Sequence, residues 1–114
     1  MKKSKIAGIG FNVPNNIVTN HDLEDMMDTT DEWIKTRSGI EERRWVEPGT
    51  ANSDLALPAC IEAIQKAGIT PNEIDIIIVG TVSSDYNFPG MAPIIQQKLG
   101  IANHVPAYDI SAAC

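Results

Sequence analysis

Apolar residues along the chain fall into three short runs that have the character of β-strands. Residues 6–11 form a brief apolar run with two glycines that stops before Pro14, which predicts a buried strand followed by a loop. Residues 74–82 are almost all apolar, most of them β-branched, which is typical of a strand covered on both faces. Residues 105–110 predict a third strand, which runs directly into the last four residues of the chain.

Two helices are predicted between the first and second runs. Thr19 and Asn20 are good N-cap residues for a short helix that continues to a pair of methionines. Thr29 with Glu32 three residues later fits a capping box for a second helix. Gly39 is expected to end that second helix.

Two more helices are predicted farther along the chain. A helix should begin at Ser53 and end at Gly68, with its apolar residues on one stripe and with Pro58 inside it. A shorter helix over residues 93–99 should be closed by Gly100.

The order of elements indicates an α/β fold in which helices cover the faces of a layered sheet. The chain has 114 residues, which is enough for about one domain. Residues 41–49 are charged and end in Pro-Gly, so an exposed loop is expected there. We find no internal repeat, low-complexity tract or dividing linker in the sequence.

The charge and hydropathy of the chain narrow the classes of function. The formal net charge is −6, which argues against bulk binding to nucleic acid or to anionic lipid. No apolar run approaches the ~18–20 residues that span a bilayer, and the basic start is not followed by a long enough apolar core for a signal peptide. A cytoplasmic protein that neither enters a membrane nor binds nucleic acid is expected.

Cys114 is the first candidate for chemistry, because it follows a buried strand and three small residues. Active residues commonly lie at strand ends in α/β proteins. A helix beginning at Cys114 would favour the thiolate, which could attack a thioester carbonyl. The alternative is a small buried hydrophobic residue, and spacing alone does not distinguish the two.

The other cysteine and the histidines suggest no further site. Cys60 lies beside the apolar stripe of a predicted helix, so we expect it to pack in the core. Two cysteines do not make a disulfide framework. His21 and His104 have no ligand spacing to either cysteine, and no metal site is expected.

Trp33 and Arg37 form the second candidate site. They lie four residues apart in a predicted helix and therefore share a face. An indole beside a guanidinium can stack an adenine ring and hold a phosphate, and Lys35, Arg43 and Arg44 add positive charge nearby. A tryptophan packed on the core under an arginine stem is the open alternative.

Phe88 lies in a loop between a predicted strand and a predicted helix, in the sequence Phe-Pro-Gly-Met. Loops in such positions often line pockets or subunit contacts, and a surface turn with a packed aromatic ring is the alternative.

Four segments in the same order resemble β-ketoacyl-acyl carrier protein synthase III, the condensing enzyme family that initiates type II fatty acid synthesis. The sequence from Thr19 to Glu24 is similar to an early helix of that family. The stretches TTDEWI and RSGI in residues 29–40 are close to its most characteristic region. The sequence FPGM in residues 88–91 is similar to its pocket and dimer loop. The sequence YDISAAC in residues 108–114 is similar to the strand and turn that carry its nucleophile.

The resemblance implies a thiolase-like fold, a layered mixed sheet with helices, of which residues 1–114 would be the N-terminal part of the first half. It implies that Cys114 accepts an acyl group from acyl-coenzyme A and that malonyl-acyl carrier protein is the second substrate. Thr29, Trp33 and Arg37 would contact coenzyme A, and Phe88 would be a wall of the acyl pocket. A homodimer is implied, and no cofactor beyond the substrates.

Some residues depart from the family pattern. Ser38 stands where threonine is frequent, and Met91 stands where small residues are common, which leaves the acyl-chain length open. The family's catalytic histidine and asparagine come farther downstream, so the chain is expected to be a piece of a longer protein. Related enzymes of polyketide or quinolone synthesis and a non-catalytic acyl-coenzyme A-binding subunit remain alternatives.

Overall fold

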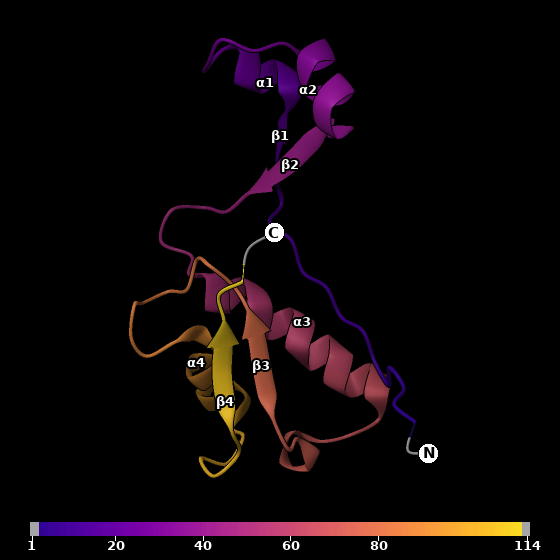
Figure 1. The fold of residues 1–114 in the computed structure, drawn as a ribbon, viewed down its shortest axis with the longest axis vertical. Coiled ribbons are helices and arrows are strands. Elements are labelled where there is room, and N and C mark those ends of the chain that lie inside the picture. Colours follow the sequence, from indigo (N-terminus) through magenta and orange to yellow (C-terminus); the bar gives the residue numbers. More distant parts are fainter. Residues whose placement is uncertain (1–2, 113–114) are drawn as a thin grey trace. The chain divides into compact units, whose positions relative to one another are not determined.

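A computed structural model of the chain describes residues 3–112 and divides it into two compact units (Figure 1). The inserted unit comprises Val13–Thr50. The main unit comprises the residues before it, up to Asn12, and those from Ala51 onward. This division was not predicted from the sequence, in which no dividing linker was found.

The inserted unit consists of β1 (Asn16–Thr19), α1 (Asn20–Glu24), α2 (Asp31–Ser38) and β2 (Glu42–Trp45). The two strands pair antiparallel, with Val18 opposite Arg43. The expectation of an exposed loop over residues 41–49 is therefore wrong for its first half. Strand β2 was not predicted because its residues are mostly charged. Its conformation is fixed by pairing with β1 and not by its local composition.

Thr19 caps α1 in the manner that the sequence indicates. Its hydroxyl oxygen accepts a hydrogen bond from the Asp22 backbone N–H at 3.2 Å, and the Asp22 carboxylate accepts one from the Thr19 N–H at 2.7 Å. The helix ends at Glu24, so Met26 and Met27 follow it and are exposed.

The N-cap of α2 is Thr30 rather than the predicted Thr29. The Thr30 hydroxyl oxygen accepts a hydrogen bond from the Trp33 N–H at 3.1 Å. The prediction missed by one residue because two adjacent threonines offer the same chemistry. At the other end Gly39 adopts a left-handed conformation with φ of 72° and ends the helix, as predicted.

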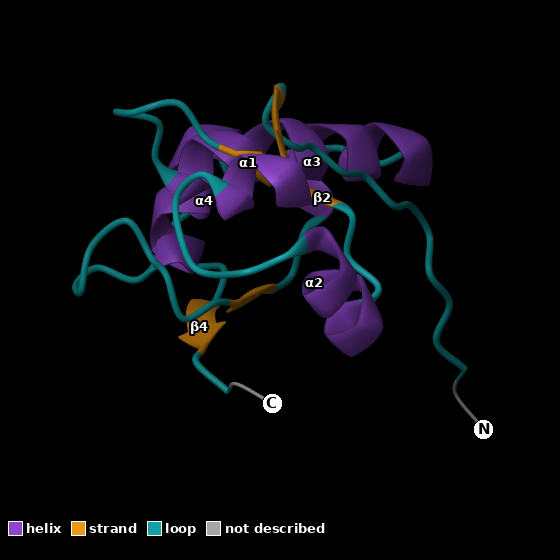
Figure 2. Cartoon of the chain, turned by 90° about the horizontal axis from the view of Figure 1, so that it is seen from above, coloured by secondary structure: helices purple, strands orange, loops and turns teal. Residues whose placement is uncertain are grey.

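The main unit contains α3 (Asn52–Ala67), the 3-10 turn η1 (Pro71–Glu73), β3 (Ile77–Gly80), α4 (Met91–Leu99) and β4 (Ala107–Ile110). β3 and β4 pair in parallel, and α4 connects them. Both α3 and α4 lie on one side of the strand pair (Figure 2). The α/β class with helices on a sheet face is confirmed, although both strands are shorter than the apolar runs that predicted them.

The buried apolar residues of the main unit lie on α4 and directly after it. Met91, Ala92, Ile95 and Ile101 are almost inaccessible to solvent. Gly68 and Gly100, each with φ of 69°, end α3 and α4 as the sequence predicts. Among residues 3–112, no helix combines the length and the apolar character needed to cross a membrane.

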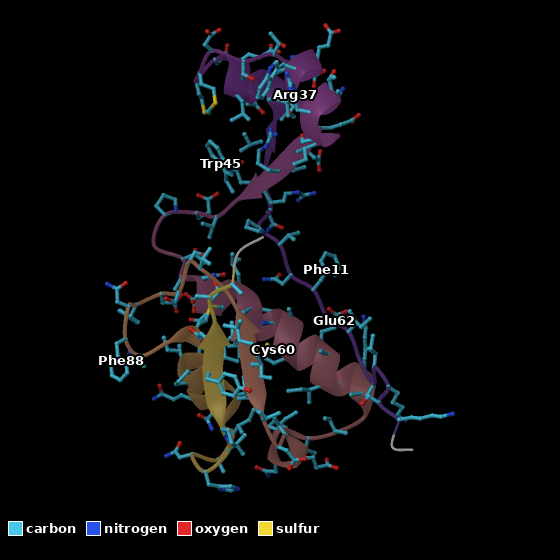
Figure 3. The ribbon with its side chains drawn as sticks, in the orientation of Figure 1. Phe11, Arg37, Trp45, Cys60, Glu62 and Phe88 are labelled. Atoms are coloured by element: carbon cyan, nitrogen blue, oxygen red, sulfur yellow. The ribbon has the colours of Figure 1, made fainter. Side chains whose placement is uncertain are left out.

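Residues 6–11 do not form the predicted strand but run as an extended segment along α3 (Figure 1). Gly8 and Gly10 lie directly on the helix, where an added Cβ atom would meet the Ala63 and Ala59 carbonyl oxygens. The Phe11 N–H donates a hydrogen bond to the Glu62 carboxylate at 3.0 Å (Figure 3). The prediction of a buried strand is therefore wrong in both respects for the described residues: Ile6, Ile9 and Phe11 are exposed, and the segment lies on a helix rather than beside a neighbouring strand.

Candidate functional site

The exposed face of α2 carries Trp33 and Arg37 one turn apart, as the helical spacing predicts. The guanidinium carbon of Arg37 lies 5.7 Å from the centre of the Trp33 ring, within the range of a cation–π contact. The indole is 59% exposed, so the pair stands at the surface of the inserted unit and is not packed in its core. Within this unit, the alternative of a core tryptophan is therefore not supported.

Trp33 borders two adjacent hollows in the surface of the inserted unit. The first has a volume of about 240 Å³ and is lined by Asp28, Thr29, Thr30 and Trp33. The second has a volume of about 340 Å³ and is lined by Thr30, Glu32, Trp33, Thr36 and Arg37. Thr29 and Arg37, which were expected to contact coenzyme A together with Trp33, thus each share a hollow with the Trp33 ring.

The other basic residues of this region are engaged in ion pairs or hydrogen bonds. Lys35 lies 3.1 Å from the Asp31 carboxylate and 3.6 Å from that of Glu41, and its hydrogen bond with Asp31 raises the pKa of the ammonium group. The Arg43 guanidinium donates to the Asn20 side-chain oxygen at 2.6 Å. The positive patch expected from the sequence is consequently less concentrated than its composition indicates.

Phe88 lies in the main unit, in the loop between β3 and α4, and its ring projects away from the strands (Figure 3). The side chain is 91% exposed in the described chain. The ring is therefore not packed against the described residues of the main unit, as the alternative of a turn with a packed aromatic ring would require. Met91, three residues later, is instead buried at the start of α4.

The Phe88 loop is fastened to the main unit at both ends. Near its start, the Asp85 carboxylate accepts a hydrogen bond from the Ser53 N–H, at the first turn of α3, at 3.0 Å. At its end, the Asp109 carboxylate accepts hydrogen bonds from the Met91 and Ala92 N–H groups at 2.6 and 2.7 Å. Asp109 therefore caps α4 from the neighbouring strand, a role that the sequence analysis missed.

The structure describes only one of the two cysteines. Cys114 lies outside the described residues, so its proposed role stays a prediction. Cys60 is half-buried on α3, borders an apolar hollow of about 240 Å³ that is lined mainly by isoleucines, and has its pKa raised by burial. A raised pKa disfavours the reactive thiolate, which agrees with the packing role expected for Cys60.

Asn20 is the other residue whose role the sequence did not reveal. It was interpreted as a possible helix cap, yet its side chain is almost fully buried inside the inserted unit, beside the buried Val18 and Leu23 of the same unit. The sequence did contain a signal for another role: Asn20 directly follows Thr19, which can cap the helix alone, so Asn20 is not needed as a cap.

No protein-family model matches the chain. Among curated relatives, the β-ketoacyl-[acyl-carrier-protein] synthase III of Symbiobacterium thermophilum is 52% identical over 109 residues, which is 96% of this chain and 33% of that protein. The chain spans about one third of the length of the curated relatives it matches.

Two solved structures show the same fold over the chain. The 3-oxoacyl-[acyl-carrier-protein] synthase III of Aquifex aeolicus superposes with a TM-score of 0.89 at 45% identity, covering 98% of this chain and 36% of that one. The priming β-ketosynthase of the R1128 polyketide pathway gives a TM-score of 0.86 at 34% identity, covering 96% and 33%. The resemblance inferred from the sequence and the thiolase-like fold are both confirmed over this span.

Proposed function

We propose that this chain, which is homologous along its length to one third of a β-ketoacyl-acyl carrier protein synthase III, is the part of such an enzyme that supplies its nucleophile and a coenzyme A-binding face. The reaction is a decarboxylative condensation of an acyl-coenzyme A with malonyl-acyl carrier protein. It starts fatty acid synthesis.

Cys114 is the proposed nucleophile. Its thiolate attacks the thioester carbonyl of acyl-coenzyme A, the thioester bond to coenzyme A breaks, and coenzyme A leaves as a thiolate that takes up a proton. The malonyl group then loses carbon dioxide, and the resulting carbanion attacks the acyl-enzyme. A β-ketoacyl product forms on the carrier protein and the Cys114 thiolate is released.

The observation that carries the proposal is the Trp33–Arg37 pair on the exposed face of α2. The indole offers a flat surface for an adenine ring, and the guanidinium offers paired donors for a phosphate. Thr29 and the indole line the same hollow, so the Thr29 hydroxyl can form a hydrogen bond with the same ligand. An acyl-coenzyme A carries both an adenine ring and phosphates.

Phe88 is proposed as a wall of the acyl pocket, and a homodimer as the assembly in which its exposed ring is covered. The ring is 91% exposed in the described chain, so it is free to line a pocket or to be covered by a second subunit. The buried position of Met91 makes Phe88 rather than Met91 the residue expected to influence acyl-chain length.

A mass measurement tests the nucleophile. The complete polypeptide that contains this chain, incubated with acetyl-coenzyme A without malonyl-acyl carrier protein, should gain one acetyl group. Cys114→Ser should abolish the stable thioester, whereas Cys60→Ser should retain it. An adduct that persists in Cys114→Ser and disappears in Cys60→Ser would refute the assignment.

Binding measurements test the face of α2 separately. Trp33→Ala and Arg37→Ala should each weaken coenzyme A binding roughly tenfold, since stacking and charge-assisted hydrogen bonds each contribute on the order of 1–2 kcal/mol. Trp45→Ala and Arg44→Ala, on β2 of the same unit, are matched controls that should leave the affinity unchanged. Equal losses in the controls would indicate damage to the unit and not to a binding face.

A priming ketosynthase of polyketide synthesis is the second candidate, because the R1128 enzyme shares the fold at a TM-score of 0.86. The two candidates differ in the acyl donors and carrier proteins that they use. Comparing condensation rates with acetyl- and longer acyl-coenzyme A on the carrier proteins of fatty acid and polyketide synthesis would separate them.

A further inference from the structure

α2 is held in the inserted unit with little help from apolar packing. None of its eight residues is buried, and only Asp31 and Ile34 are even half-buried. A helix of this length is not stable by itself in water, so other contacts must fix its position. Those contacts are polar: the Glu24 carboxylate accepts from the Asp31 N–H at 2.6 Å, Lys35 pairs with Glu41, and a further group of hydrogen bonds comes from the side chain of Asn20.

The amide group of Asn20 ties together the two ends of α2. Its Nδ2 atom donates to the Asp31 carboxylate at 2.9 Å, at the first residue of the helix. The same nitrogen donates to the Ile40 carbonyl oxygen at 2.8 Å, two residues beyond the last one. One buried nitrogen therefore sets the distance from the start of the helix to the chain that leaves it.

The remaining polar groups of Asn20 fix the amide to the strands of the same unit. Its Oδ1 atom accepts from the Arg43 guanidinium at 2.6 Å, and Arg43 also donates to the Val18 carbonyl oxygen at 3.2 Å. The Asn20 backbone N–H donates to the Glu41 carbonyl oxygen at 3.1 Å. Both donors and the acceptor of the side chain are thus satisfied, at 1% exposure.

This pattern requires an amide and not merely a polar side chain. The side chain must donate twice on one side, to a carboxylate and a carbonyl, and accept on the other from a guanidinium. Aspartate has the same shape, but an ionised aspartate has no donor and would set a carboxylate oxygen against the Asp31 carboxylate and the Ile40 carbonyl.

We propose that Asn20 is a positioning residue that sets the orientation of α2 and thereby aligns Trp33 and Arg37 for coenzyme A. The inference rests on the proposed function of the α2 face. Asn20 does not touch the ligand; it acts by holding both ends of the helix whose outer face does. Displacing α2 would separate the indole and the guanidinium from their two ligand groups without altering either side chain.

A donor–acceptor exchange provides the test, in the complete polypeptide. Asn20→Asp removes both donors, while Asp31→Asn supplies a donor at the other end of the same hydrogen bond but gives up the ion pair with Lys35, so Asp31→Asn alone is measured as well. The double variant Asn20→Asp/Asp31→Asn restores that bond with its direction reversed. Asn16→Asp, an exposed asparagine on β1, is the matched control for the chemical change itself.

For each variant we would measure coenzyme A affinity by calorimetry, KM and kcat for the acyl donor, and thermal unfolding. Asn20→Asp should weaken coenzyme A binding about tenfold, the cost of one buried hydrogen bond replaced by repulsion. KM should rise by a similar factor with kcat at saturation nearly unchanged. The double variant should recover a large part of the affinity, and Asn16→Asp should match the wild type.

The outcomes distinguish this inference from the proposed function. If folded Asn20→Asp binds coenzyme A as tightly as the wild type, or if the double variant binds no better than Asn20→Asp, the positioning role is refuted. If Asn20→Asp does not fold, the double variant carries the test, and a folded double variant that does not bind overturns the inference. A wild type that binds no coenzyme A refutes the proposed function instead.

Discussion

At the scale of single residues, the chain relies on glycines where two backbones meet and on short polar side chains where a helix begins. Gly8 and Gly10 allow the N-terminal segment to lie on α3, because any side chain there would fall on the Ala63 or Ala59 carbonyl oxygen. Thr30 supplies the first hydrogen bond of α2. Each of these roles can be tested by a substitution that adds or removes a few atoms.

Gly8→Ala and Gly10→Ala should each lower the free energy of unfolding by about 1–3 kcal/mol, since overpacking forces the segment away from the helix. Gly80→Ala is the control, because nothing lies within 4 Å of a Cβ atom added there. Chemical denaturation of the three variants provides the comparison. Equal stabilities at positions 8, 10 and 80 would mean that the N-terminal segment does not pack on α3.

Thr30→Ala should destabilise the protein by about 1 kcal/mol through loss of the N-cap, whereas Thr29→Ala should have a smaller effect on stability. The adjacent threonines form a matched pair, and thermal unfolding of the two variants compares them. Thr29 and Thr30 both border the hollow beside Trp33, so either alanine variant should weaken coenzyme A binding, and the difference in stability is what separates the two. A larger loss of stability from Thr29→Ala would restore the capping position expected from the sequence.

At the scale of elements, α4 depends on a residue of the next strand. The Asp109 carboxylate satisfies two of the N–H groups that any helix leaves free at its start, and it places a negative charge at the positive end of the helix dipole. The end of the Phe88 loop is held by the same contact. The position of this loop therefore follows the position of β4.

Asp109→Asn should cost about 1–3 kcal/mol of stability, because the amide can accept one of the two hydrogen bonds but opposes the other with its own N–H groups. Asp75→Asn, an exposed carboxylate of the same unit, should be close to neutral. Hydrogen exchange at the Met91 and Ala92 amides should accelerate in Asp109→Asn alone. Unchanged exchange at these two amides would contradict the capping role.

The ends of α2, α3 and α4 could be predicted from the sequence, but the end of α1 and the strands β1 and β2 could not. Gly39, Gly68 and Gly100 adopt a left-handed conformation that disfavours other residues, so their effect is local and visible in the sequence. β1 and β2 are short, and β2 is mostly charged; they become strands only through pairing across more than twenty residues.

The candidate site was predictable for a similar reason. Trp33 and Arg37 could be paired by helical spacing alone, whereas the roles of Asn20 and Asp109 depend on partners that only the fold brings near. Sequence reasoning therefore identified residues that share an exposed helix face more readily than residues that hold others in place.

At the scale of the whole molecule, hydrogen-bonded carboxylates are spread over both units. Hydrogen bonds and nearby positive charges lower the pKa of six of them: Asp22, Glu24, Asp31, Asp54, Glu62 and Glu73. A carboxylate with a lowered pKa in the folded state contributes stability above its unfolded pKa and loses that contribution as the pH falls through its folded pKa.

The free energy of unfolding should therefore decrease as the pH falls below about 4, with several carboxylates contributing. His21 acts in the opposite direction: its hydrogen bond with Glu24 raises its pKa, so its contribution to stability is lost as the pH rises through that raised folded pKa. Denaturation at a series of pH values measures both. Glu24→Gln should reduce the acid-side slope and remove the His21 effect, and an unaltered profile would contradict this account.

The close contact between Gly90 and Asp109 restricts which substitutions these two positions can accept during evolution. A Cβ atom at position 90 would lie 2.6 Å from one carboxylate oxygen of Asp109 and 2.9 Å from its carboxyl carbon. The two sites, nineteen places apart, are therefore not free to drift separately. Homologues with another residue in place of Gly90 should also have a shorter side chain in place of Asp109. Homologues that retain Asp109 should retain Gly90.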